Sequence, residues 1–131
     1  MRGLDTPALL EILHDTAVGR DLLKSLRGEE LGTTELQMFE LRAVAARAAR
    51  GERALRETAL ARLRRRITVL PITAEAVNEA GRFLRAEGKP AGYPALVWGA
   101  LAAAGCSEWI TTRAYAPPKG KLPFKVRLIS D

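Results

Sequence analysis

Three short apolar runs, separated by helical patterns, most constrain the fold of this chain. They are ITVLPI (67–72), EWITT (108–112) and FKVRLIS (124–130), and each is rich in the β-branched or apolar residues of a buried strand. Residues 2–5 and EELGTTEL (29–36) carry two weaker strand patterns. Strands that alternate with helices pair in parallel and need helices on both faces. The sequence therefore predicts a three-layer α/β domain with a central, mostly parallel sheet of four or five strands.

Helix start and stop signals fill the intervals between these runs. Thr6-Pro7 is typical of an N-cap and first helical residue, and Gly51 and Gly105 are typical of helix ends. The predicted helices cover residues 6–15, 35–50, 52–66, 73–88 and 94–104. Because no repeat or low-complexity segment divides the chain, we expect a single domain over residues 1–131.

Several classes of protein do not match this sequence. With Cys106 as the one cysteine, an internal disulfide and a cysteine-based zinc site are excluded. No apolar run approaches the roughly 20 residues that span a bilayer, and the first residues carry no signal-peptide pattern. No glycine-rich phosphate loop is present. We expect an intracellular, cytoplasmic protein with no membrane partner.

The chain is basic, with a net charge of +6 and 16 arginines among its 21 basic residues. A basic excess favours polyanion partners such as RNA. A bias in genome composition explains the same charge, because the chain has only one asparagine and one glutamine. The arginines of RLRRR (62–66) equally suit a solvated helix end. Lys119, Lys121 and Lys125 are candidate phosphate contacts, or solvated loop charges.

Two acidic residues are candidates for chemistry. Asp5 follows the first strand pattern, where it either caps a helix or contributes to a site at the carboxyl edge of the sheet. Glu40 falls within a predicted apolar helical stripe, where a carboxylate costs free energy unless it is paired or functional. The other members of that stripe are Leu36, Phe39, Ala43, Val44 and Arg47.

The remaining conspicuous side chains have simpler interpretations. We expect His14, the one histidine, at the surface and Cys106 as a small packing residue. Trp98 and Trp109 are predicted to lie in the core.

Five segments in order give the chain a family resemblance. They are LDT (4–6), TTELQMFELRA (33–43), ITVLPIT (67–73), GYPALVWGALAAAG (92–105) and WITTR (109–113). In this order they resemble PIN domains, most of all the VapC-like toxin type. The resemblance implies an Mg²⁺- or Mn²⁺-dependent ribonuclease with three or four clustered acids, since hard cations prefer carboxylate oxygens. Asp5 matches the first acid and Glu40 the second, with Thr6, Thr111 and Thr112 near the site.

The sequence departs from that pattern at two positions. Tyr93 and Pro94 stand where the third acid is expected, and a tyrosine ordinarily ionises only near pH 10. Arg113 aligns closest to the fourth acidic position. We therefore expect no resident metal, or Mg²⁺ or Mn²⁺ at Asp5 and Glu40 if the protein is active. One hypothesis is that Arg113 replaces the metal and neutralises both carboxylates.

These features predict a divergent PIN-domain protein whose nuclease activity is lost or weak. Such a protein would act by binding RNA or an antitoxin-like partner, and the resemblance implies a homodimer. One alternative is a working endoribonuclease that draws further acids from Glu35 or Glu108. Another is a structural interaction domain without a nucleic-acid role.

Overall fold

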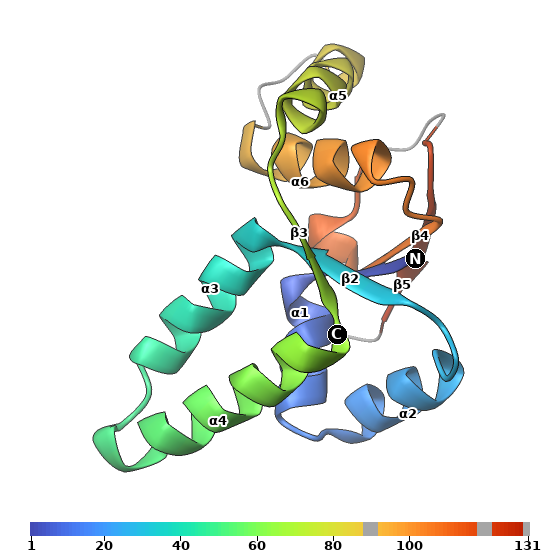
Figure 1. Cartoon of the computed structure of the whole chain (residues 1–131). Helices are drawn as coiled ribbons and strands as arrows, with labels where there is room; N and C mark the ends of the chain where they lie inside the picture. The colour runs from blue at the N-terminus through green and yellow to red at the C-terminus, as the bar shows by residue number, and fades with distance from the viewer. Residues whose placement is uncertain (88–91, 118–121, 130–131) are drawn as a thin grey trace.

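The chain folds around one parallel sheet. A computed structural model describes residues 1–87, 92–117 and 122–129, with residues 85–87 described by backbone only (Figure 1). The five strands lie in the order β3-β2-β1-β4-β5, and every neighbouring pair is parallel. The prediction of a mostly parallel sheet of four or five strands is confirmed. The strands are β1 (Arg2–Leu4), β2 (Leu31–Thr34), β3 (Thr68–Leu70), β4 (Glu108–Thr111) and β5 (Lys125–Leu128).

Helices cover both faces of the sheet, as predicted. One buried cluster joins the sheet to α1 (Thr6–Leu13), α2 (Ala17–Ser25), α3 (Glu35–Ala46) and α4 (Arg50–Arg66). A second cluster joins the opposite face to α5 (Ala74–Glu87) and α6 (Gly92–Ala103). The two groups of helices lie on either side of the strands in Figure 1. A short 3₁₀ helix, η1 (Arg113–Tyr115), follows β4.

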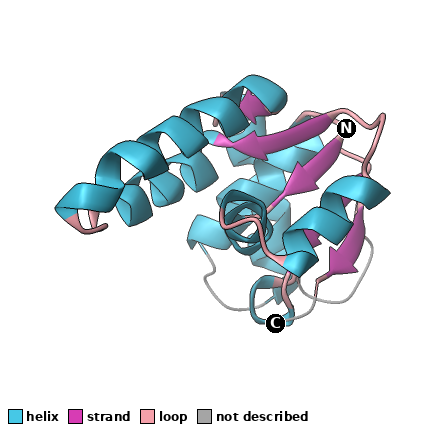
Figure 2. Cartoon of the chain, turned by 90° about the horizontal axis from the view of Figure 1, so that it is seen from below, coloured by secondary structure: helices cyan, strands magenta, loops and turns pink. Residues whose placement is uncertain are grey.

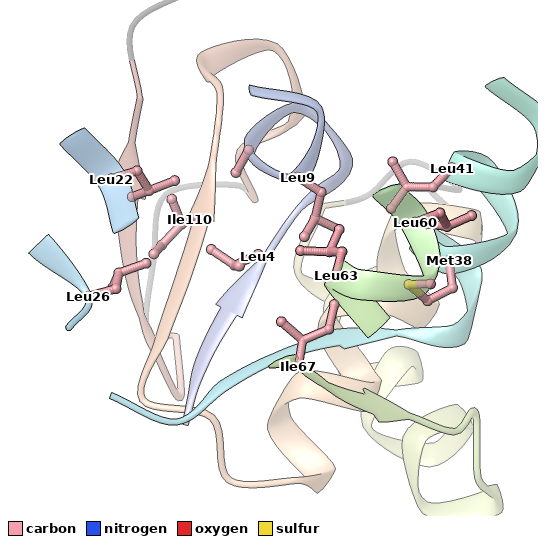
Figure 3. Packing of buried hydrophobic residues seen from close by; sticks show 11 residues of the cluster. Leu4, Leu9, Leu22, Leu26, Met38, Leu41, Leu60, Leu63, Ile67 and Ile110 are labelled. Carbon is pink, nitrogen blue, oxygen red and sulfur yellow. The ribbon is translucent and has the colours of Figure 1, made fainter. Parts of the chain in front are cut away.

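The first cluster brings together side chains from far apart in the sequence. Leu4 of β1 and Ile110 of β4 lie beside Leu9 of α1 and Leu63 of α4 (Figure 3). Leu4, Leu9 and Ile110 have no solvent exposure, so this contact fixes the helical layer on the sheet. Within the described residues, no helix is both long enough and apolar enough to cross a bilayer.

The second cluster contains both tryptophans, as the sequence predicted. Trp98 and Trp109 pack with Phe83 and Phe124, and Phe83 meets Trp98 edge to face at 5.7 Å between ring centroids. Cys106 is buried here, and burial raises the pKa of its thiol. It is a packing residue, as expected.

Helix α2 is an element that the sequence patterns did not predict. Only Gly19 and Leu22 of this helix are buried, so its sequence lacks the apolar stripe by which a helix is usually predicted. Thr16 caps the helix by accepting a hydrogen bond from the backbone N–H of Gly19 at 3.0 Å. A Cβ at Gly19 would lie 2.2 Å from the carbonyl oxygen of Glu11, so only glycine permits this close approach of α2 to α1.

The predicted apolar stripe of α3 is wrong. Phe39 is 69% exposed and Arg47 is exposed, whereas the buried side chains are those of Gln37, Met38, Leu41 and Ala45. Packing against α1 and α4 sets this rotation, because Met38 and Leu41 join the first cluster. Glu40 is consequently half-buried at the margin of the packed face.

The close packing of α6 on α5 predicts a strong effect of one added methyl group. A Cβ at Gly99 would lie 2.2 Å from the carbonyl oxygen of Ala76, so Gly99→Ala should lower the free energy of unfolding by about 1–3 kcal/mol. Gly51, on α4, has nothing within 4 Å of such a Cβ, and Gly51→Ala should be neutral or stabilising by up to about 1 kcal/mol. Urea denaturation with an unchanged m-value measures both. Equal stability of the two variants would contradict this packing.

Candidate functional site

The carboxyl ends of three neighbouring strands form the candidate site. Asp5 follows β1, Thr34 ends β2 and Thr111 ends β4. Strands β2 and β3 extend the sheet on one side of β1, and β4 and β5 extend it on the other. Asp5 therefore lies at the point where the strand order reverses, which is where open parallel sheets form binding crevices.

Asp5 is buried and held by two hydrogen bonds. Its Oδ1 accepts from the backbone N–H of Thr6 at 2.7 Å, and its Oδ2 accepts from the Thr111 hydroxyl at 2.6 Å. Asp5 is thus the N-cap of α1, one residue before the N-cap that the sequence suggested. Asp5 can cap the helix and belong to the site at the same time. Its Oδ1 accepts the capping hydrogen bond from Thr6, and its Oδ2 accepts from Thr111 at the end of β4.

Burial dominates the protonation of Asp5. Desolvation raises the pKa of this carboxyl above its ordinary value, and the nearby charge of Glu40 also raises it. The hydrogen bonds from Thr111 and Thr6 oppose that shift. A carboxylate whose pKa is raised by burial in a pocket is a typical sign of a functional position.

Tyr93 occupies the place where a third acid was expected. Its hydroxyl donates to Glu40 Oε1 at 2.5 Å and also lies 3.3 Å from the carbonyl oxygen of Leu36. Burial and the Glu40 carboxylate both raise the pKa of Tyr93, so the phenol stays a proton donor. The opening turn of α6 is therefore tied to α3 by a phenol–carboxylate hydrogen bond.

Gln37 is a site residue that the sequence analysis missed. It is 2% exposed, its amide oxygen accepts from the Thr34 hydroxyl, and its side chain is close enough to Asp5 to lower the pKa of that carboxyl. The signal was present in the sequence. Thr34 is the N-cap of α3 and Gln37 comes three residues later, which is the spacing of a capping box.

The candidate site contains a pocket of about 520 Å³. Its polar part is formed by Asp5, Gln37, Glu40 and Tyr93, and the rest of its wall is mostly apolar or aromatic. Two buried polar atoms of lining residues, Thr6 Oγ1 and Trp109 Nε1, have no hydrogen-bond partner among the described residues. Both atoms are themselves almost without accessible surface, so they lie behind the wall of the pocket. The other lining residues are Pro7, Leu10, Pro94, Val97, Trp98, Ala114, Tyr115 and Ala116.

The structure does not bring Arg113 to the two carboxylates. Arg113 is exposed, does not line the pocket, and forms no ion pair with Asp5 or Glu40 within the described part of the chain. Thr112, also a predicted neighbour of the site, is buried and precedes Arg113 as the N-cap of η1.

The predicted phosphate contacts lie away from the pocket or outside the described residues. Lys125 begins β5 and is exposed, at the edge of the sheet. Lys119 and Lys121 lie outside the described residues. His14 is exposed at the end of α1, as predicted.

Glu35 and Glu108 do not extend the acidic cluster. Glu35 is exposed and its Oε1 accepts from the backbone N–H of Ile72 at 2.8 Å. Glu108 begins β4, at the opposite end of that strand from Thr111, and its Oε1 lies 2.9 Å from Arg127 and 3.8 Å from Arg2. Neither residue lines the pocket.

The residues present do not fit a divalent metal held by the protein alone. Both oxygens of Asp5 and one oxygen of Glu40 already accept hydrogen bonds. Over the described ranges, no group of three or more Asp, Glu, His or Cys residues could hold a metal ion. Mg²⁺ is usually held by one or two carboxylates together with waters and substrate phosphates, so Asp5 and Glu40 do not complete its coordination without such further ligands.

Comparison with known proteins agrees with this fold. Residues 4–113 match the family model of the PIN domain. No curated protein matches the chain.

Solved structures similar to this chain include chains from toxin–antitoxin complexes. A chain of VapBC2 from Rickettsia felis, bound to a DNA fragment from its promoter, superposes with a TM-score of 0.77 at 13% identity, covering 98% of each chain. DNA-bound VapBC from Salmonella typhimurium gives 0.73 at 18% identity, covering 97% of this chain and 98% of the other. A toxin–antitoxin complex from Klebsiella pneumoniae gives 0.66 at 12% identity, covering 95% and 99%.

The raised pKa of Asp5 predicts a specific pH dependence of stability. The native state keeps a proton that the unfolded chain releases near its ordinary pKa of 3.8, so stability falls as the pH rises from there through the folded-state pKa. Asp5→Asn keeps a capping side chain and removes this loss. The melting temperature of the variant minus that of the wild type should therefore be larger at about pH 7 than at about pH 3.5. Thermal melts at both pH values measure it, and a difference that shrinks with rising pH would contradict the assignment.

Proposed function

Because the chain belongs to the PIN-domain family, we propose that it is a divergent member of the VapC-like toxin type that binds a partner instead of cleaving RNA with a metal ion. The proposal takes residues 1–131 as one PIN-like domain. It assigns the residual acidic site to Asp5 and Glu40, with Tyr93 in the position of the missing acid. The backbone N–H of Thr6 and the hydroxyl of Thr111 hold the Asp5 carboxylate in place by hydrogen bonds.

The hydrogen bond from Tyr93 to Glu40 is the observation that carries this proposal. A third carboxylate at this position would supply an oxygen ligand to a metal. The phenol instead donates a proton to a carboxylate, and its raised pKa keeps that proton in place. The Tyr93 hydroxyl and the Glu40 carboxylate form a donor–acceptor pair beside the first turn of α6. Such a pair suits recognition of a polar ligand better than coordination of a cation.

The pocket chemistry favours a basic side chain of a protein partner. Asp5 and Glu40 supply negative charge, while Trp98, Trp109 and Tyr115 supply aromatic surface. A guanidinium group pairs with carboxylates through a planar fork of N–H donors and stacks on aromatic faces. The similar structures are themselves toxin–antitoxin complexes, which supports an antitoxin-like protein as the source of that side chain.

We also propose that the chain forms homodimers. Val77 and Leu84 are exposed apolar residues of α5, spaced seven positions apart and therefore on one face of that helix. An apolar strip on a helix is a natural contact for a second copy.

The second candidate function is a working Mg²⁺- or Mn²⁺-dependent endoribonuclease. The resemblance to VapC-like PIN domains favours it, because that resemblance implies a metal-dependent ribonuclease. It requires a further acid, and both Glu35 and Glu108 are engaged outside the pocket.

Metal titration separates the two candidates. We expect no tight binding of Mn²⁺ or Mg²⁺ by calorimetry and no metal-dependent cleavage of a mixed single-stranded RNA pool. Tyr93→Asp should create Mn²⁺ binding by placing a third carboxylate beside Glu40. Wild-type binding and cleavage that vanish in Asp5→Asn would replace our proposal with the nuclease.

Partner binding has its own test. The probe is the product of the gene adjacent to that of this chain, co-expressed and measured by calorimetry. Glu40→Gln should weaken its binding by about thirtyfold or more, because it leaves a basic side chain in the pocket without its partner. Glu75→Gln, an exposed change on α5, should leave the affinity unchanged. Equal affinities of the two variants would remove the pocket from the partner interface.

A further inference from the structure

The positive charge of the chain is concentrated on one helix. Helix α4 carries seven arginines and two glutamates, a net charge of +5, whereas the whole chain has +6. Helices α3 and α4 lie side by side and extend away from the sheet (Figures 1 and 2). This pair of helices is called the α3–α4 arm below.

Helix stability explains only part of this arginine pattern. Arg64, Arg65 and Arg66 in the last turn interact favourably with the helix dipole. Arg50 and Arg53 lie in the first turn, where a positive charge is unfavourable, and the N-cap residue Ala49 offers no side-chain hydrogen bond. Helix stability therefore does not account for the arginines at that end.

A second pocket lies between the two helices of the arm. It has a volume of about 350 Å³, and Arg42 of α3 lines it together with Arg64 and Arg65 of α4. The remaining lining residues are Glu57, Leu60 and Ala61. The three arginines are exposed and have no hydrogen bond or ion pair within residues 1–87, 92–117 and 122–129, whereas Arg56 on the same helix pairs with Glu52 at 3.4 Å.

An exposed aromatic ring lies on the same side of α3. Phe39 is 69% exposed and precedes Arg42 by three residues, so the two side chains are neighbours on the helix surface. Arginine forks match phosphate oxygens, and an exposed ring offers a stacking surface for a base. A strand that offers both phosphates and bases would engage the arginines and the ring together, so this pair of features favours nucleic acid as the ligand.

We propose that the α3–α4 arm binds the phosphodiester backbone of single-stranded nucleic acid, with Arg42, Arg64 and Arg65 contacting phosphates and Phe39 stacking on a base. Helix α4 is about 25 Å long, enough to follow several consecutive phosphates. This site shares no lining residue with the acidic pocket, so it goes beyond the partner-binding function and does not depend on it.

Fluorescence anisotropy with labelled mixed-sequence strands tests the proposal. The variant Arg42→Gln/Arg64→Gln/Arg65→Gln should reduce the slope of log affinity against log salt by about 2, the change for three phosphate contacts on a single strand. At about 0.1 M salt this is a loss of about a hundredfold in affinity. RNA and DNA strands run in parallel show whether the 2′-hydroxyl contributes.

A matched control removes the same charge elsewhere. Arg20→Gln/Arg27→Gln/Arg82→Gln changes three exposed arginines that line neither pocket. It should keep most of the affinity, and circular dichroism melts verify that both triple variants fold. Equal losses in the two variants, or no salt-dependent binding by the wild type, would overturn the proposal.

The role of Phe39 separates nucleic acid from other polyanions. Phe39→Ala should weaken binding of the strand by about tenfold and leave binding of inorganic polyphosphate unchanged. Displacement of the strand by polyglutamate at a lower concentration than by an unlabelled strand would instead assign the arm to an acidic protein.

Discussion

The hydrogen bond between Thr111 and Asp5 joins residues 106 positions apart and depends on β1 lying between β2 and β4. Parallel pairing places the ends of these strands at one edge, and Leu4 and Ile110 just before that edge are fully buried. The apolar contact beneath the site therefore holds Asp5 in a desolvated position. The raised pKa of that carboxyl, the cap of α1 and the floor of the pocket all follow from this arrangement.

The fold places acidic and basic side chains on different parts of the molecule. Two carboxylates converge at the centre of the sheet edge, while the arginines of α4 extend along the arm. A cationic side chain and a polyanion would thus meet different surfaces of the same domain. Since neither pocket shares a residue with the other, the proposed partner binding and the proposed strand binding should respond to different mutations.

Some of the site could be predicted from local patterns and some could not. The order of the motifs singled out Asp5, Glu40 and Tyr93, and the structure brings these three side chains into one pocket. The capping-box spacing of Thr34 and Gln37 is readable in the sequence, but the approach of the Gln37 side chain to Asp5 arises only when β1 and β2 pair. The stripe of α3 was misassigned, with Phe39 predicted inside and found outside, because tertiary packing rotates that helix. Helix α2 escaped detection since its burial rests on a backbone contact of Gly19 and on very few apolar side chains.

The sequence alone determined the parallel α/β architecture, because alternating apolar strands and capped helices have few other ways to bury their faces. It also places Tyr93 and Pro94, and no acidic residue, at the start of α6. Only the tertiary structure decided which side chain contacts Glu40. Whether Tyr93 or Arg113 reaches Glu40 depends on where the first turn of α6 and the turn after β4 lie in space. The structure places the phenol 2.5 Å from the carboxylate and leaves the guanidinium exposed, a choice that spacing along the chain does not encode.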